Sequence, residues 1–376
     1  MTTLVGGRLV GHQQPVNLTI DQGRIVDMSG APGQPGIPPA RIDLDGLLLA
    51  PGLIDLQING GFGEDFTEDP SSIWRVGARL PEHGVTAFLP TIISSPGGTV
   101  DRALQTLRAR PAGYRGAEPL GLHLEGPMLS PARPGVHDTA QLRTPSLGLI
   151  DGWSPAAGVR MVTMAPELPG AEAVIRALRA AGVVVAAGHT SADYDQARAA
   201  FAWGVTCVTH LFNAMEPFAS RAPGLIGALV EDPGVVAGLI ADGVHSHPAT
   251  VGAAWKWLRP TRMALVTDAM AAAGIGDGTY ELGGMTVTVE DGRPVDASGR
   301  LAGSTLTLDR AVRNLVEFTA CPPAEAVAAA ATVPAAVLGL SERGRLAIGA
   351  RADLTVFDGS MRVQATVIDG EVVWQP

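Results

Sequence analysis

The sequence predicts an α/β protein whose central unit is a (β/α)8 barrel of the TIM type. Three observations predict this fold: eight short apolar runs alternate with helix-like stretches, the runs are continuous, and polar residues follow nearly all of them. Continuous apolar runs are typical of parallel strands buried on both faces. The chain has 376 residues, of which 46% are hydrophobic. This length suits a barrel of about 250 residues with a smaller accessory module.

The eight apolar runs are expected to form the barrel strands. Between them lie Ala-rich stretches with helical periodicity, such as 171–181 and 193–203. A segment of alternating pattern, Tyr280 to Val295, contains an Asp-Gly turn and is expected to be a hairpin inserted into the eighth unit. The runs are Leu53–Ile58, Thr86–Ile92, Pro119–Leu124, Arg160–Met164, Val183–Ala187, Cys207–Leu211, Val235–Ile240 and Met263–Val266.

Short strand-like segments separated by turns occur at both ends of the chain, in residues 3–29 and 353–373. Because similar material flanks the barrel, these ends are expected to pair into a small β-sandwich domain. Its predicted extent is 1–50 and 344–376, which leaves 51–343 for the barrel. The Gly- and Pro-rich stretch from Ala31 to Pro39 is expected to be a loop.

The composition argues against several classes of partner. A net charge of -10 disfavours nucleic acid and anionic membrane surfaces as partners. The apolar runs are too short to span a bilayer, and the segment after Met1 lacks a signal-peptide pattern. The two cysteines, Cys207 and Cys321, cannot build a disulfide framework. We therefore expect a protein of the reduced cytoplasm.

Three residues at predicted strand ends form a metal-ligand set. Glu125 lies in the sequence His-Leu-Glu-Gly-Pro, and His189 and His210 follow two consecutive predicted strands. A single histidine at a strand end is more often structural, but the carboxyl ends of barrel strands converge on one mouth. Imidazole and carboxylate groups suit Zn²⁺ or another divalent first-row ion, and three protein ligands leave a position for water.

Asp268 follows the eighth predicted strand and is the predicted general acid/base, since a carboxylate beside the metal can accept and return a proton. Its simpler interpretation is a helix N-cap. Many metal hydrolases of this architecture end the first strand with His-x-His, which helps to hold a second metal. Here Gln57 and Asn59 occupy those positions, and neutral amides are poor ligands for Zn²⁺. The sequence therefore predicts one tightly bound metal.

The motifs around these residues resemble those of the N-acetylglucosamine-6-phosphate deacetylases, a branch of the amidohydrolase superfamily. The resemblance is collinear over essentially the whole chain, and it is specific because amidohydrolases in general lack the Asn-Ala-Met and Asp-Gly-x-His elements. The matching segments are Pro51–Gly60, His123–Pro127, Ala165–Glu167, Gly188–Thr190, His210–Met215, Asp242–His245, Thr267–Ala269, Leu301–Ser304 and Ala352–Leu354.

The resemblance implies hydrolysis of N-acetylglucosamine 6-phosphate to glucosamine 6-phosphate and acetate. It assigns the metal to Glu125, His189 and His210 and the acid/base role to Asp268. The metal is expected to be zinc, with iron, manganese or cobalt as alternatives. His137, on a loop after a predicted strand, is expected to donate to the developing oxyanion. The implied substrate contacts are Val136, His137, Asn213, Ala214, Arg221, Asp242, His245, Leu301, Ala302 and Gly303.

The resemblance also implies a homodimer in which Arg221 and His245 reach the neighbouring subunit's substrate. The 6-phosphate calls for arginine and backbone N–H donors, which fits this arrangement. His123 lies on the same strand face as Glu125 and is expected to orient it.

Two other functions fit parts of the pattern. A different amidohydrolase, such as a cyclic-amide hydrolase or a deaminase, usually needs His-x-His on the first strand and often a carboxylated lysine. The only lysine, Lys256, lies in a helix-like segment far from a strand end. A catalytically inactive barrel that acts as a binding or scaffold subunit would explain the loss of both strand-one histidines. The presence of Glu125, His189, His210 and Asp268 argues against that interpretation.

Overall fold

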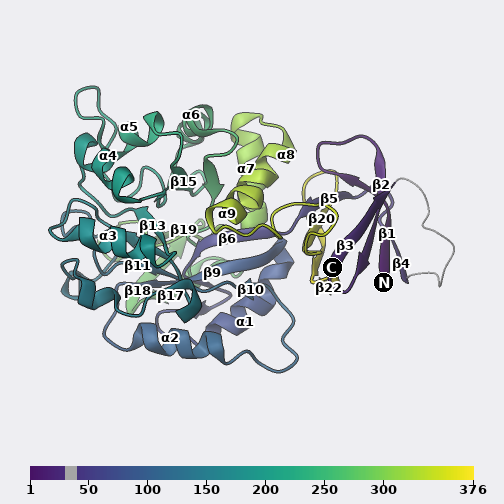
Figure 1. Ribbon diagram of the computed structural model, residues 1–376, viewed down its shortest axis with the longest axis horizontal. Helices are drawn as coiled ribbons and strands as arrows, with labels where there is room; N and C mark the ends of the chain where they lie inside the picture. Colours follow the sequence, from purple (N-terminus) through teal and green to yellow (C-terminus); the bar gives the residue numbers. More distant parts are fainter. Residues whose placement is uncertain (30–39) are drawn as a thin grey trace.

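The computed structural model describes residues 1–29 and 40–376, so the loop expected at Ala31–Pro39 lies outside the described residues. Figure 1 shows a large barrel with its helices and, beside it, a smaller sheet that contains both chain termini.

Eight parallel strands form the barrel wall in the order in which they occur along the chain. The wall nearly closes because Asn59 N–H donates to the Ala269 carbonyl and Asp268 N–H donates to the Gln57 carbonyl, each at 2.8 Å. The predicted barrel is therefore confirmed. Its strands are β6 (Leu53–Ile58), β9 (Val85–Ile93), β11 (Leu122–Glu125), β12 (Val159–Met164), β13 (Val184–Ala187), β14 (Cys207–Val208), β15 (Val236–Leu239) and β16 (Met263–Leu265).

Strand β14 is shorter than the sequence predicts. The apolar run continues to Leu211, but the chain leaves the extended conformation at His210, whose φ is +26°, and again at Phe212, whose φ is +77°. Apolar character alone does not distinguish a strand from the buried turn that follows it.

The helices lie on the outside of the barrel, where their apolar faces cover the strands. The two predicted helical stretches are α3 and α4, and α4 begins with a capping box between Asp193 and Gln196. Among the described residues, no helix is long and apolar enough to cross a membrane. The α-helices are α1 (Ser72–Arg79), α2 (Thr99–Arg108), α3 (Ala171–Ala180), α4 (Tyr194–Trp203), α5 (Gly224–Glu231), α6 (Pro248–Leu258), α7 (Leu308–Thr319), α8 (Pro323–Ala330) and α9 (Thr332–Val337).

Short 3-10 helices and two-residue strands complete the connections around the barrel. They are η1 (Leu80–His83), η2 (Thr139–Gln141), η3 (Leu147–Ile150), η4 (Pro155–Ala157), β7 (Gly60–Gly61), β8 (Glu64–Asp65) and β10 (Glu118–Pro119).

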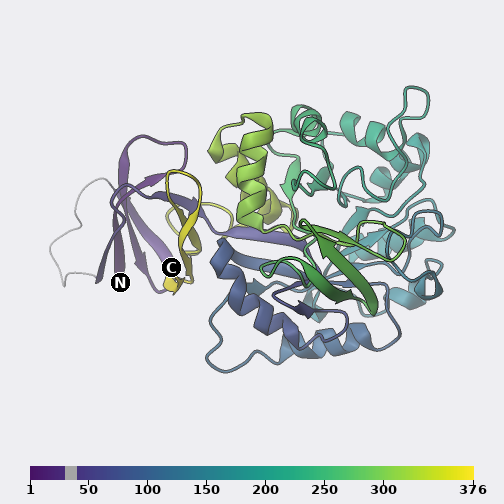
Figure 2. The same cartoon turned by 180° about the vertical axis from the view of Figure 1, so that it is seen from behind.

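The insertion predicted in the eighth unit is a three-stranded antiparallel sheet of β17 (Gly278–Leu282), β18 (Met285–Glu290) and β19 (Arg293–Val295). Figure 2 shows this sheet, in green, across the near side of the barrel. It packs on its own apolar cluster, which includes Met270 and Ala302. The insertion therefore extends the wall of the barrel mouth.

The small sheet at the side of the barrel joins the two ends of the chain. β5 pairs antiparallel with β20, and a separate apolar cluster fills the module. The expected pairing of the termini is thus observed, whereas the division of the chain at residues 50 and 344 remains our prediction. The strands are β1 (Thr2–Leu9), β2 (Pro15–Asp21), β3 (Arg24–Ser29), β4 (Ala40–Asp43), β5 (Leu48–Pro51), β20 (Leu354–Phe357), β21 (Val363–Ile368) and β22 (Glu371–Trp374).

Candidate metal centre and substrate cavity

The three predicted metal ligands meet at the barrel mouth. Glu125 is the last residue of β11, while His189 and His210 come just after β13 and β14. The Nε2 atoms of the two histidines lie 3.0 Å apart, and Glu125 Oε1 lies 3.3 Å from His189 Nε2 and 3.1 Å from His210 Nε2. All three side chains are buried. Three strand ends that are distant in the sequence thus place one donor atom each around a common point.

The donor set fits a divalent cation. The ligand atoms of Glu125, His189 and His210 all lie within 4.8 Å of one another. The two imidazole Nε2 atoms face each other at 3.0 Å, so either a proton on one of them or a cation near both must offset the repulsion between their lone pairs. Burial opposes ionisation of Glu125, but the two histidines outweigh it and hold the pKa of Glu125 well below its usual range. The carboxylate is therefore ready to bind a metal.

The ring of His189 is oriented by the loop that follows β11. Its Nδ1–H donates to the carbonyl of Arg133 at 3.0 Å, which directs the Nε2 lone pair towards Glu125. The loop passes so close to this ring that a Cβ on Gly135 would lie 2.8 Å from His189 Cε1. Gly135 also has a φ of +56°, so only glycine fits here without strain.

Asp268 lies beside the predicted ligands and is held by the two strand-one amides. Gln57 Nε2 donates to Asp268 Oδ1 at 3.1 Å and to Glu125 Oε1 at 3.0 Å, and Asn59 Nδ2 donates to the same Asp268 oxygen at 2.8 Å. Burial and then the charge of Glu125 raise the pKa of Asp268. Gln57 and Asn59 thus serve as hydrogen-bond donors to carboxylates.

A second buried carboxylate fixes the backbone that carries Asp268. Asp55 Oδ2 accepts the Thr267 hydroxyl at 2.6 Å, and Asp55 Oδ1 accepts the Thr267 N–H at 3.3 Å. The Ser304 hydroxyl donates to the Thr267 carbonyl at 2.6 Å. Burial raises the pKa of Asp55 to about 7. These contacts stabilise Asp268 at a φ of +49°, a conformation that costs about 1–2 kcal/mol for a residue other than glycine.

His137 lines the cavity from the loop that follows β11. The backbone N–H of Ser94, just after β9, donates to His137 Nδ1 at 3.2 Å. The neutral ring therefore carries its proton on Nε2, which lies 3.8 Å from Glu125 Oε2. Burial lowers the pKa of His137 to about 3, so the ring stays neutral at physiological pH. Sequence reasoning missed Ser94, although it lies just after a predicted strand.

The expectation that His123 orients Glu125 is wrong. His123 Nδ1 lies 3.0 Å from the Leu56 carbonyl, and Nε2 lies 2.8 Å from Thr163 Oγ1, which in turn lies 2.6 Å from Thr209 Oγ1. His123 and Glu125 do share a strand face, but residues two apart are separated by about 7 Å along a strand. His123 therefore belongs to a lower layer of the barrel interior.

A cavity of about 400 Å³ is lined by the predicted metal ligands, Asp268 and His137. It brings together most of the predicted substrate contacts, and its apolar wall includes Ile93 and Leu282, which the sequence did not single out. Arg300 also lines it and was missed, although it directly precedes a predicted contact. The predicted residues that line the cavity are Glu125, Val136, His137, His189, His210, Asn213, Ala214, His245, Asp268, Leu301 and Gly303.

Three predicted substrate residues are not among those that line this cavity. Ala302 is buried in the apolar cluster of the insertion. Asp242 holds the ring of His245, with 2.7 Å between Asp242 Oδ2 and His245 Nδ1. Arg221 is exposed, in the turn closed by the backbone bridge between Ala219 and Ala222.

Every arginine that lines the cavity already has a carboxylate partner. Arg133 NH2 lies 2.7 Å from Glu216 Oε1, and Arg300 NH2 lies 2.9 Å from Asp296 Oδ2. His245 is likewise paired with Asp242. Among the described residues that line the cavity, no free guanidinium is therefore present to bind an anion.

The model of the amidohydrolase family matches residues 48–373, which is most of the chain. The chain belongs to the amidohydrolase family. This amidohydrolase is 42% identical to human N-acetylglucosamine-6-phosphate deacetylase, with 98% of this chain and 90% of the relative aligned. It is also 38% identical to N-acetylgalactosamine-6-phosphate deacetylase of Escherichia coli O157:H7, over 89% of this chain and 90% of the relative.

Solved structures of similar proteins agree with the amidohydrolase fold. N-acetylglucosamine-6-phosphate deacetylase from Pasteurella multocida superposes with a TM-score of 0.91 at 31% identity and covers 99% of both chains. A point mutant of the Mycobacterium smegmatis enzyme, in complex with N-acetyl-D-glucosamine-6-phosphate, gives a TM-score of 0.88 at 37% identity and covers 99% of this chain and 98% of that chain.

Proposed function

We propose that this amidohydrolase removes the acetyl group from N-acetylglucosamine 6-phosphate, releasing glucosamine 6-phosphate and acetate. The observation that carries the proposal is the buried cluster of Glu125, His189 and His210 beside Asp268, in a chain 42% identical to an enzyme of that name. We propose that these three side chains hold one divalent metal, zinc in the first instance. When bound, such a metal supplies Lewis-acid polarisation and activation of water.

Asp268 is the proposed acid/base. Both amide donors, from Gln57 and Asn59, reach Oδ1, and no hydrogen bond from a described residue reaches Oδ2. Oδ2 is therefore the oxygen available to accept a proton from the attacking water and return it to the departing nitrogen. An amide nitrogen is a poor leaving group, so this second proton transfer is necessary. Because Gln57 and Asn59 are engaged as donors, we propose a single metal.

His137 is the proposed electrophilic donor. Because Ser94 donates to Nδ1, the Nε2–H of His137 points towards the proposed metal ligands Glu125, His189 and His210. The acetyl oxygen would develop negative charge at that place. A neutral imidazole can donate this hydrogen bond to the developing oxyanion while keeping its own proton. We assign the remaining substrate contacts to the loops that carry Val136, Asn213, Ala214, His245 and Leu301–Gly303.

We propose that the phosphate is bound with help from a second copy of the chain. The cavity arginines Arg133 and Arg300 are already paired, whereas Arg221 is exposed and has no ion-pair partner among the described residues. Phe218, three residues before Arg221 in the sequence, is exposed, and its ring lies 5.9 Å from that of Trp257, which is also exposed. Exposed apolar side chains that lie together are one mark of a protein–protein contact surface, which supports the proposal of a second copy at this face.

In the proposed homodimer, Arg221 reaches the neighbouring cavity, whereas His245, expected from the sequence to do the same, lines the cavity of its own chain. If so, mixing inactive Arg221→Ala chains with inactive Asp268→Asn chains should restore activity, because one of the two mixed sites then has both intact residues. Failure of any mixture to regain activity, with mixed dimers demonstrated, would contradict this arrangement. We also propose a cytoplasmic location, consistent with the two free, buried cysteines.

The test of the proposed function is acetate release from N-acetylglucosamine 6-phosphate, measured beside the unphosphorylated sugar and N-acetylgalactosamine 6-phosphate. We expect the highest kcat/KM for the first substrate and a value lower by at least about 100-fold for the sugar without phosphate, since charge-assisted hydrogen bonds to phosphate contribute about 1.5–3 kcal/mol each. Equal rates with and without phosphate would overturn the phosphate assignment. Preference for the galactose epimer would redirect the substrate assignment to the activity named for the E. coli relative.

A further inference from the structure

The backbone at His189 needs support from outside its own strand. Its φ is +48°, a left-handed conformation that costs a residue other than glycine about 1–2 kcal/mol. The His189 carbonyl accepts the Ser130 N–H at 2.9 Å, and the Thr190 N–H donates to the Ala214 carbonyl at 3.1 Å. These contacts fix the His189 carbonyl and the Thr190 N–H. The Thr190 hydroxyl and the Ser191 N–H are bonded by a different residue.

Glu167 is that residue. It lies just beyond β12, and its Oε1 accepts the Ser191 N–H at 2.7 Å while its Oε2 accepts the Thr190 hydroxyl. Thr190 Oγ1 in turn accepts the Ala192 N–H at 2.9 Å. One carboxylate thus fixes two consecutive residues of the turn, and hydrogen bonds to an ionised acceptor are about twice as strong as neutral ones.

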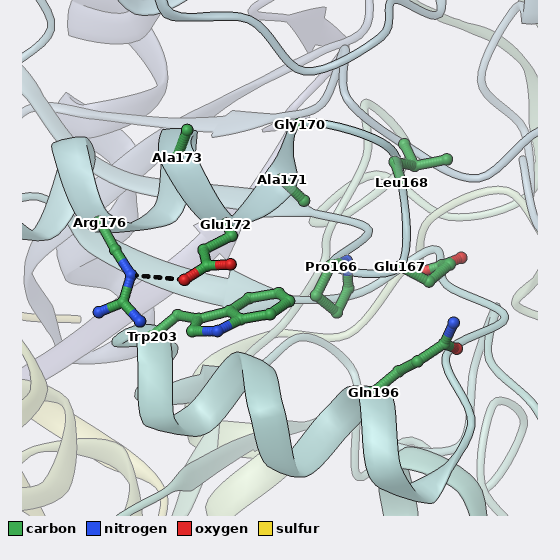
Figure 3. Close-up of a pocket in the computed structure, with 10 residues that line it drawn as sticks. All are labelled: Pro166, Glu167, Leu168, Gly170, Ala171, Glu172, Ala173, Arg176, Gln196 and Trp203. Atoms are coloured by element: carbon green, nitrogen blue, oxygen red, sulfur yellow. Dashed lines mark hydrogen bonds and ion pairs between the residues drawn. The ribbon is translucent and has the colours of Figure 1, made fainter.

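Glu167 is placed to act on the turn and not on the substrate. It is not among the residues that line the substrate cavity. It lies instead at the edge of a separate surface cavity of about 570 Å³ between α3 and α4 (Figure 3), away from the Glu172–Arg176 ion pair in the same cavity. Among the described residues Glu167 has no ion-pair partner, and its side-chain contacts there are the hydrogen bonds to Thr190 and Ser191.

We propose that Glu167 is a positioning residue for the metal centre. By fixing Thr190 and Ser191, it holds the His189 ring where Nε2 faces Glu125 and His210. The inference rests on the proposed metal site, because it assigns Glu167 an effect on metal affinity and ligand geometry. It does not require that Glu167 touch metal or substrate.

The direct test is the variant Glu167→Gln, which keeps the shape of the side chain but replaces the charged acceptor with an amide. We expect its affinity for Co²⁺, measured by competition with a chromogenic chelator, to fall by about 10-fold or more, as for other residues that orient metal ligands. The visible absorption spectrum of the Co²⁺-loaded protein should change as well. The matched control is Glu172→Gln, which removes a carboxylate from the same surface cavity and should match the wild type in both measurements.

Wild-type Co²⁺ affinity and spectrum in Glu167→Gln would overturn the inference. Thr190→Val removes the hydroxyl partner, so it should weaken Co²⁺ binding in the same direction, and the two changes together should be less than additive. Full additivity would mean that Glu167 does not act through Thr190 and would also overturn the inference. If Glu167→Gln fails to fold, as judged by circular dichroism, Thr190→Val against Glu172→Gln decides the question. A wild-type chain that binds no metal would instead contradict the proposed metal site itself.

Discussion

Two buried aspartates, one beside the small sheet and one at the barrel mouth, differ in the groups that donate hydrogen bonds to them. Asp353, beside β20, is 4% exposed and contacts both Arg343 and Arg351, with 3.1 Å between its Oδ1 and Arg351 Nε. Asp268 is 9% exposed, yet its hydrogen-bond donors are the neutral amides of Gln57 and Asn59. The two carboxylates are therefore similarly buried, but Asp353 contacts cationic donors and Asp268 contacts neutral ones.

This difference distinguishes a carboxylate that stabilises the fold from one that can take part in proton transfer. Two guanidinium groups contact Asp353, so its ion pairs tie β20 to the segments before it. Amide donors leave Asp268 able to gain and lose a proton, and burial raises its pKa. A buried carboxylate without a cationic partner, at a barrel mouth, thus marks the reacting group more reliably than burial alone.

The largest expected effect comes from removing a metal ligand at the mouth. His210→Ala should lower metal affinity by at least about 1,000-fold and reduce turnover to background, because a two-ligand site loses most of its binding free energy. The fold should persist, since the barrel core does not depend on this side chain. Elemental analysis after dialysis, together with acetate release, checks both statements. Retained metal with normal turnover would exclude His210 as a ligand.

The structural aspartate should show the reverse pattern. Asp353→Asn removes one of the two carboxylates that pair with Arg343, whose side chain is 9% exposed. Because Glu118 still contacts Arg343, the cost should lie at or below the lower end of the about 3–5 kcal/mol that follows from leaving a buried charge unpaired. Urea unfolding should therefore show a lower midpoint, while kcat of the folded enzyme stays near that of the wild type. Unchanged stability would show that the ion pairs of Asp353 do not stabilise the fold.

The smallest effect should come from weakening the amide support of Asp268. The Asn59 hydrogen bond lowers the pKa of Asp268, so Asn59→Ala should raise that pKa further. Asp268 must be deprotonated to accept a proton, so the acidic limb of the kcat/KM profile should move to higher pH, with a loss of about 10-fold at neutral pH. A pH–rate profile beside that of the wild type measures the shift. A limb that moves to lower pH would contradict the proposed role.

Much of the barrel was predictable because its signals are local in the sequence. Continuous apolar runs predict buried parallel strands, and polar residues just after them, such as Glu125 and His189, predict the mouth. The length of β14 was not predictable, because the turn at His210 directly continues the run and is as buried as the strand before it.

The supporting contacts of the site were not predictable either, because they join residues far apart in the chain. Asp55 reaches Thr267, and Ser94 reaches His137. His123 was assigned the wrong neighbour, since strand alternation gives the face of a residue but not its height in the barrel. Pairing of the strand-one amides with Asp268 likewise depends on closure of the barrel.

The most direct test of the central claim is the turnover of Asp268→Asn with its metal content measured in the same sample. We expect about one bound ion per chain, as in the wild type, and acetate release slower by about 10²–10⁴-fold, which is the usual contribution of a general acid/base. Stability should be equal or higher, because a neutral amide replaces a buried carboxylate. Turnover near the wild-type value, with the metal retained, would exclude Asp268 as the general acid/base.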